Sequence, residues 1–154
     1  MIQGTALLGT MTGPLLNRYL SIKNLFLIGE VLMFIELGLV AVFQAVNLPY
    51  CLLACIMLFM FTYQCSLGSY YFVYITQVGN PSINTIGVFF IWFWVLIISI
   101  ITPPMIDSLG VSATFAIFSG CAFTGAVYFW FFMKSTQGLD KEQLKVLYIP
   151  ENLK

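Results

Sequence analysis

NLFLIGEVLMFIELGLVAVFQAV, residues 24–46, has the length and the apolar composition of a helix that crosses a bilayer, which requires about 20 predominantly apolar residues. It lies in a longer interval, residues 24–133, that contains no Lys, Arg or His and only three acidic residues, Glu30, Glu36 and Asp107. The surface of a water-soluble domain needs charges at short intervals to stay solvated. We therefore predict that this interval lies in lipid.

The overall composition narrows the class of protein further. The chain has 154 residues, of which 60% are hydrophobic and 8% charged, with a mean hydropathy of +0.97 and no net charge. These values are typical of a protein with several membrane helices, and the continuous apolar runs of about 20 residues disfavour a β-barrel. The few basic residues form no stripe, so we expect no nucleic-acid partner. Because His is absent, we expect no enzyme, catalytic residue, metal site or cofactor.

Five apolar segments within residues 1–133 are predicted to form membrane helices, and a polar tail covers residues 134–154. The first segment would be a helix about 22 Å long, shorter than the ~30 Å hydrocarbon core, and we interpret it as the back half of a longer helix. The predicted fold class is therefore all-α, a polytopic membrane helical bundle. The expected helices are residues 2–16, 24–46, 50–76, 86–106 and 111–133, with a loop over residues 77–85.

The basic residues predict how these helices are oriented. Arg18 and Lys23 lie in the connector between the first two helices, and the other four follow the last helix: Lys134, Lys141, Lys145 and Lys154. With five helices, these two segments fall on the same side of the membrane, and the turns on the opposite side carry no basic residue. Cytoplasmic loops are enriched in Lys and Arg. We therefore predict an integral, multi-pass protein whose tail is cytoplasmic.

Two carboxylates lie in the second predicted helix. Glu30 is about two turns from the predicted cytoplasmic end, and we interpret it as a structural residue that reaches the interface or pairs with Lys23. Glu36 lies near the middle of the membrane, where an acidic side chain is costly unless it faces protein or water. It could relay a proton or form a hydrogen bond to a neighbouring helix, and we favour the hydrogen bond.

In the first helix, Gly9 and Gly13 form a GxxxG pair, which permits close contact between helices.

YQCSLGSYYFVY, residues 63–74, places aromatic and polar side chains in the middle of the third predicted helix. Gln64, Gly68 and Phe72 are spaced i, i+4, i+8 and so share one face of a helix. An amide, a helix notch and an aromatic wall on one face would suit an uncharged, hydroxyl-rich solute. Ordinary packing between helices explains the same residue types, and on residue type alone we favour packing.

Several short motifs resemble those of one transporter family. Residues 102–110, TPPMIDSLG, followed by Thr114-Phe115, are similar to a PPL…LG…TF motif at a junction between two helices. Residues 66–72, SLGSYYF, are similar to a GPxxW motif in which Gly68 is kept. Read in order, these segments resemble helices eight to twelve, the C-terminal part, of a sugar porter of the major facilitator superfamily.

The predicted cytoplasmic segments agree with this resemblance. Residues 17–23, NRYLSIK, are similar to the basic loop D-R-x-G-R-R between helices eight and nine of that family. After the last helix, Thr136 and Gly138 match two letters of the family signature PETKG. The resemblance therefore covers nearly the whole chain.

The resemblance also implies roles for individual residues. The sugar-facing positions would be Tyr63, Gln64, Gly68, Phe72 and Trp92. The gating motif at the cytoplasmic side would comprise Arg18, Lys23, Gln77 and Gly138. The chain departs from the family at positions where sugar porters have Asn, Asn, Glu and Arg, which here are Ile91, Val95, Gln77 and either Asn84 or Thr85.

Two functional hypotheses follow. In the first, the chain is part of a transporter that moves a sugar or a similar polyhydroxylated solute by alternating access between two six-helix halves, and it is incomplete on its own. In the second, it is a truncated porter that serves as a structural or accessory membrane subunit. The face formed by Tyr63, Gln64, Gly68 and Phe72, which the chain shares with the family, favours the first hypothesis. The positions at which the chain departs from the family favour the second. The expected partners are the lipid bilayer, a sugar-like solute, and an N-terminal half or another membrane subunit.

Overall fold

The computed structural model describes residues 2–79, 81–136, 138–140 and 143–144, which are almost entirely helical and include no strand. The elements are α1 (Ile2–Asn17), α2 (Ile22–Ala45), α3 (Pro49–Tyr63), the π-helical turn η1 (Gln64–Gly68), α4 (Ser69–Val78), α5 (Pro81–Leu109) and α6 (Val111–Phe132). Four spans within the described residues are long and apolar enough to cross a membrane: α2, the continuous rod from α3 to α4, α5 and α6. α1, with 16 residues, would be about 24 Å long, shorter than the hydrocarbon core. The prediction of an all-α membrane bundle is confirmed.

The link between α4 and α5 is shorter than the loop predicted over residues 77–85. α4 continues to Val78, and α5 already begins at Pro81. Proline fits the first turn of a helix, because that turn leaves its N–H groups unpaired in any case. At the other end of α5, Gly110 has a φ of +82°, a conformation that favours glycine, and it joins α5 directly to α6.

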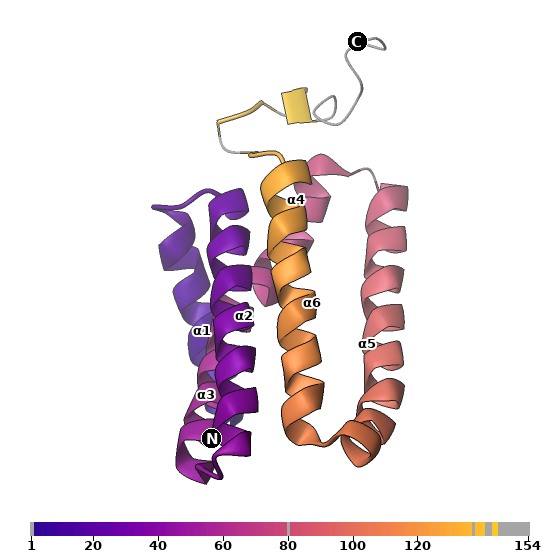
Figure 1. Cartoon of the computed structure of the whole chain (residues 1–154). Helices are drawn as coiled ribbons and strands as arrows, with labels where there is room; N and C mark the ends of the chain where they lie inside the picture. The colour runs from indigo at the N-terminus through magenta and orange to yellow at the C-terminus, as the bar shows by residue number, and fades with distance from the viewer. Residues whose placement is uncertain (1, 80, 137, 141–142, 145–154) are drawn as a thin grey trace.

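The bundle is built around α2, which packs along α6 on one side and along α3 on the other (Figure 1). Two hydroxyl groups of α6 reach carbonyl oxygens of α2: Ser119 Oγ donates to Phe34 O at 2.8 Å, and Ser112 Oγ donates to Ala41 O at 2.7 Å. Small hydroxyl residues allow membrane helices to approach closely and to form hydrogen bonds between them. These two serines of α6 therefore join it to α2.

α5 differs from the other spans, because none of its residues is buried. It lies at the edge of the bundle, beyond α6, and it contacts α6 and α4 (Figure 1). Its side-chain contact with α4 includes a hydrogen bond from Tyr71 Oη to Gly87 O, at 3.4 Å.

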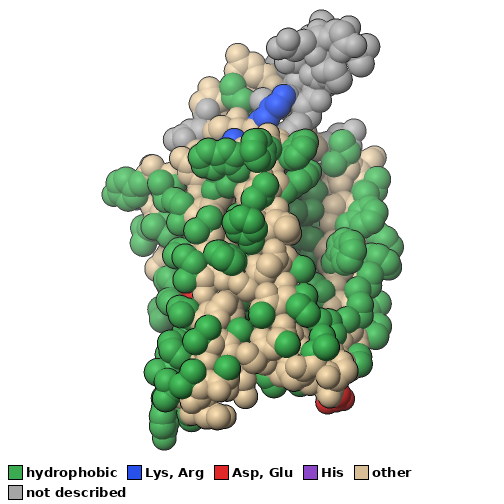
Figure 2. All heavy atoms as spheres, viewed as in Figure 1, with side chains coloured by type: hydrophobic (Ala, Val, Ile, Leu, Met, Phe, Trp, Pro, Cys, Tyr) green, Lys and Arg blue, Asp and Glu red, His purple; other side chains and the backbone are tan. Residues whose placement is uncertain are grey.

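One end of the bundle gathers the connector after α1, the end of α4 and the first residues after α6. Lys23 Nζ donates to Trp130 O at 3.4 Å, and Tyr74 Oη donates to Lys134 O at 3.0 Å. Figure 2 shows Lys and Arg side chains near this end, above a mainly apolar surface. We call it the basic end. A buried cluster lies there, formed by Ile22, Leu25, Phe26, Tyr70 and Met133. That this end faces the cytoplasm stays a prediction.

Candidate functional site

A π-helical turn interrupts the rod Pro49–Val78 near its middle. This turn, Gln64–Gly68, contains two of the residues expected to face a sugar. The Ser69 hydroxyl donates to Gln64 O at 3.1 Å across the altered backbone. π-Helical turns inside α-helices occur frequently at functional sites, and transporters bind their solutes near the midplane, where helices are discontinuous. The turn is therefore the starting point of the candidate site.

α1 packs closely against this turn through its two glycines. A Cβ atom on Gly9 would lie 2.6 Å from Phe61 O, and one on Gly13 would lie 3.2 Å from Cys65 O. Between them, Thr12 Oγ1 and the Cys65 thiol are 2.8 Å apart, and Cys65 Sγ donates to Gly9 O at 3.2 Å. The prediction that the GxxxG pair permits close helix contact is confirmed.

The side chain of Gln64 occupies the notch that Gly68 leaves. A Cβ atom on Gly68 would collide with Gln64 Oε1, and it would lie 3.1 Å from Cε1 of Tyr63. Within the part of the chain that the structure describes, the Gln64 amide has no hydrogen-bond partner, and it is only half-buried. The structure thus brings Tyr63, Gln64 and Gly68 together, with an amide donor and acceptor left open.

The two aromatic residues expected at the site lie further away along the fold. Phe72 lies one turn beyond Gly68, half-exposed, with its ring edge-on to Tyr71 at 5.7 Å between centroids. Trp92 lies on α5 with 65% of its surface exposed. Among the described residues, no hydrogen bond or ring contact joins Trp92 to the other four positions. The structure does not bring it into one cluster with them.

At the basic end, a polar cavity of about 150 Å³ brings three segments together. Gln77 of α4 lines it together with Asn17 at the end of α1, Ser21 of the connector and Thr136, which follows α6. Of the other residues expected in the gating motif, Arg18 is exposed and Lys23 donates to Trp130 O at 3.4 Å.

Gly138 closes a turn in the chain beyond α6. The Leu139 N–H donates to Thr136 O at 3.5 Å, and Gly138 has a φ of +78°. A positive φ at the third position of such a turn favours glycine. Thr136 is buried. The two residues that match the family signature therefore both have a structural role in this turn.

Glu36 is buried between α2 and α3, with 4% of its surface exposed. Thr62 Oγ1 donates to Glu36 Oε1 at 2.7 Å, whereas Oε2 has no partner among the described residues. The predicted hydrogen bond from Glu36 to a neighbouring helix is confirmed. Glu30 lies against α6, where a Cβ atom on Gly125 would be 3.2 Å from Glu30 Oε1.

The role of Thr62 was missed by sequence reasoning. Ser66 Oγ, in the π-helical turn, donates to Thr62 O at 2.7 Å, and a Cβ atom on Gly29 would collide with Ser66 Oγ. The signal in the sequence was the i, i+4 spacing of Thr62 and Ser66 opposite a glycine of the preceding helix. A polar contact between α2 and the rod thus lies directly beside the candidate site.

Comparisons with known proteins agree with this architecture. A family model described as "Sugar (and other) transporter" matches residues 1–148. The chain is similar to the high-affinity glucose transporter ght2 of Schizosaccharomyces pombe, with 36% identity over 58 residues, which are 38% of this chain and 11% of that protein. It is also similar to the probable high-affinity hexose transporter ght7 of the same yeast, with 36% identity over 63 residues, 41% of this chain and 12% of that protein. These matches thus span only a small part of either relative. No solved structure gave a match.

Proposed function

Because this chain belongs to the sugar transporter family, whose model matches residues 1–148, we propose that it forms part of a transporter for a sugar or a similar polyhydroxylated solute. In this proposal it supplies helices from the C-terminal half, and a second half completes the solute pathway by alternating access. The basic end faces the cytoplasm, as the distribution of Lys and Arg predicts.

The open amide of Gln64 at the π-helical turn is the observation that carries this proposal. A solute rich in hydroxyl groups loses its hydrogen bonds to water when it enters a membrane protein, and it must recover them from the protein. An amide offers donors and an acceptor in one side chain. The absence of a side chain at Gly68 leaves the space that the Gln64 amide occupies, and Tyr63 and Phe72 supply aromatic surface for the apolar face of a sugar ring.

The exposure of α5 supports the proposal that a second half completes the transporter. Its residues Trp92 and Trp94 are more than half exposed, and no residue of the helix is buried. We propose that part of this surface contacts helices of the N-terminal half, and that Trp92 reaches the solute only in that assembly. The two similar yeast proteins, one named a glucose transporter and the other a probable hexose transporter, support a hexose as the first solute to test.

The test is uptake of radiolabelled hexose by vesicles that contain this chain joined to the N-terminal helices of the yeast glucose transporter to which it is similar. Gln64→Ala removes at least one hydrogen bond to the solute, worth about 0.5–1.5 kcal/mol, so we expect uptake at low hexose concentration to fall roughly two- to tenfold or more. The matched control is Gln44→Ala, near the far end of α2, which should leave uptake unchanged.

Equal uptake by the Gln64→Ala and Gln44→Ala variants would reject Gln64 as a solute ligand. If the unsubstituted protein is inserted and folded but does not accumulate any of the hexoses offered, the accessory-subunit hypothesis is supported instead of transport.

A further inference from the structure

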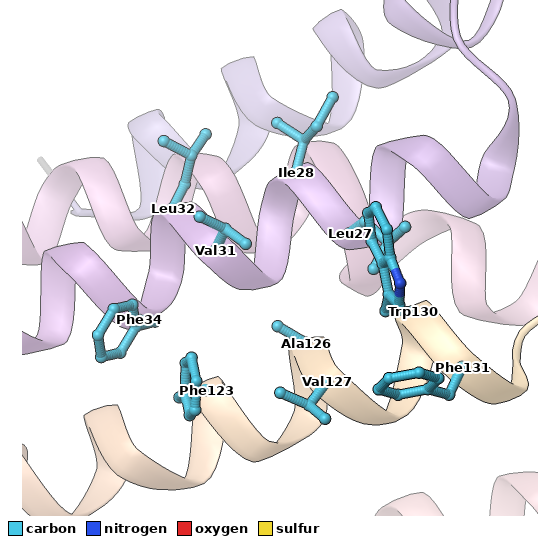
Figure 3. Close-up of a pocket in the computed structure, with 10 residues that line it drawn as sticks. All are labelled: Leu27, Ile28, Val31, Leu32, Phe34, Phe123, Ala126, Val127, Trp130 and Phe131. Atoms are coloured by element: carbon cyan, nitrogen blue, oxygen red, sulfur yellow. The ribbon is translucent and has the colours of Figure 1, made fainter.

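The surface between α2 and α6 contains an apolar groove with a volume of about 550 Å³. Figure 3 shows side chains of both helices along it, with Trp130 beside Leu27 at one end and Phe123 near Phe34 at the other. Val31 and Val127 lie between these ends, and Ala126 is the small residue among the lining side chains.

The groove is shorter than the thickness of one leaflet of a bilayer. From Leu27 to Phe34 on α2, and from Phe123 to Trp130 on α6, the chain advances seven residues, or about 10 Å of helix. One leaflet of the hydrocarbon core is about 15 Å thick, because the whole core is about 30 Å. A groove of this length accommodates part of one acyl chain.

A cation lies beyond the basic end of the groove. Lys23 precedes Leu27 by four residues, so it lies on the same face of α2, about 6 Å closer to the end of the bundle. Within the described residues Lys23 forms no ion pair, and its Nζ donates only to Trp130 O, at 3.4 Å. Trp130 lines the groove, and Trp is enriched at the level of lipid headgroups. The nearest carboxylate on this side of α2, Glu30, is about 10 Å deeper along the helix and lies against Gly125.

From this arrangement we propose that the α2–α6 groove is a binding site for an anionic phospholipid. One acyl chain lies along the groove, and the headgroup phosphate accepts hydrogen bonds from the Lys23 ammonium. The phosphate replaces the long bond from Lys23 to Trp130 O by a charge-assisted one, which is shorter and stronger. No residue of the π-helical turn lines the groove, so this proposal does not depend on which solute the protein carries.

The test uses Trp130 as the reporter. In the Trp92→Phe/Trp94→Phe variant Trp130 is the single Trp, since the chain contains three. The protein is reconstituted in phosphatidylcholine vesicles in which either phosphatidylglycerol or part of the phosphatidylcholine carries brominated acyl chains, which quench Trp on contact. A Lys near anionic lipid contributes ~1 kcal/mol, so we expect the brominated anionic lipid to bind roughly fivefold more tightly than the zwitterionic one.

Matched variants separate the groove from general surface charge. Lys23→Gln should reduce the preference to about one, Lys23→Arg should retain it, and Arg18→Gln on the connector should leave it unchanged. A second single-Trp chain that keeps Trp94, on α5, should show no preference. Far-UV circular dichroism checks that each variant keeps its helix content.

Equal quenching of Trp130 by the two lipids, or a preference that survives Lys23→Gln, would overturn the proposal. Absence of quenching by either lipid, together with cross-linking of two copies through the groove, would also overturn it and would assign the groove to contact between protein chains.

Discussion

The close contact between α1 and the π-helical turn makes Gly9→Ala the sharpest test of the packing. A Cβ atom at this position would lie 2.6 Å from Phe61 O and 2.9 Å from the Cβ atom of Gln64, whereas ordinary contacts begin at 3.4 Å. α1 must therefore move away by about 0.8 Å. Such overpacking costs about 1–3 kcal/mol, and the higher helix propensity of Ala offsets up to ~1 kcal/mol of it. We expect a net loss of about 1–2 kcal/mol.

The assay is reversible unfolding in mixed micelles of a mild detergent and sodium dodecyl sulfate, followed by circular dichroism. The matched control is Gly4→Ala on the same helix, where a Cβ atom would meet nothing within 4 Å. Because only the helix propensity changes there, we expect this variant to be as stable as the original chain or more stable by up to ~1 kcal/mol. If Gly9→Ala and Gly4→Ala unfold at the same detergent fraction, the close contact does not exist in the membrane protein.

Two further predictions concern side chains described above. Thr62→Val removes the only donor to Glu36 among the described residues, so it should destabilise the chain by about 1–2 kcal/mol in the same unfolding assay. The control is Thr76→Val, at an exposed Thr bonded within its own helix, which should change stability by less than ~0.5 kcal/mol. Equal effects of the two substitutions would contradict the prediction. Gly138→Ala forces a side chain into a positive φ and should open the turn to Thr136, seen as faster hydrogen exchange of the Leu139 amide; an unchanged exchange rate would exclude a strained turn.

The four membrane spans could be predicted from hydropathy because each is an apolar run at least as long as a bilayer requires. Their boundaries could not, as the link at Gly79 shows. Gly, Asn and Pro at positions 79–81 are typical of a loop, yet Pro81 also suits the first turn of a helix, and only the fold distinguishes the two.

The candidate site, too, could be predicted only in part. The i, i+4 spacing of Gln64 and Gly68 predicted that they share one face of a helix, and the structure brings the two residues together. The π-helical turn around them packs against Gly9 and Thr12, more than 50 residues earlier in the chain, and no local pattern contains that information. The hydrogen-bond partner of Glu36 could not be predicted from sequence either, because Thr62 resembles any other small residue of a membrane helix.

The isolation of α5 has a consequence for how the chain is made in the cell. Its mean hydropathy of 2.4 is high enough for it to enter the bilayer before it contacts other helices, and none of its residues is buried by packing. α2, in contrast, carries two carboxylates into the membrane, and Glu36 gains its hydrogen bond only when α3 arrives. Insertion and association of membrane helices are separable steps. We therefore expect two different courses of biogenesis within one chain: α2 must associate with α3 before Glu36 gains its hydrogen bond, whereas α5 can enter the lipid before it associates with other helices.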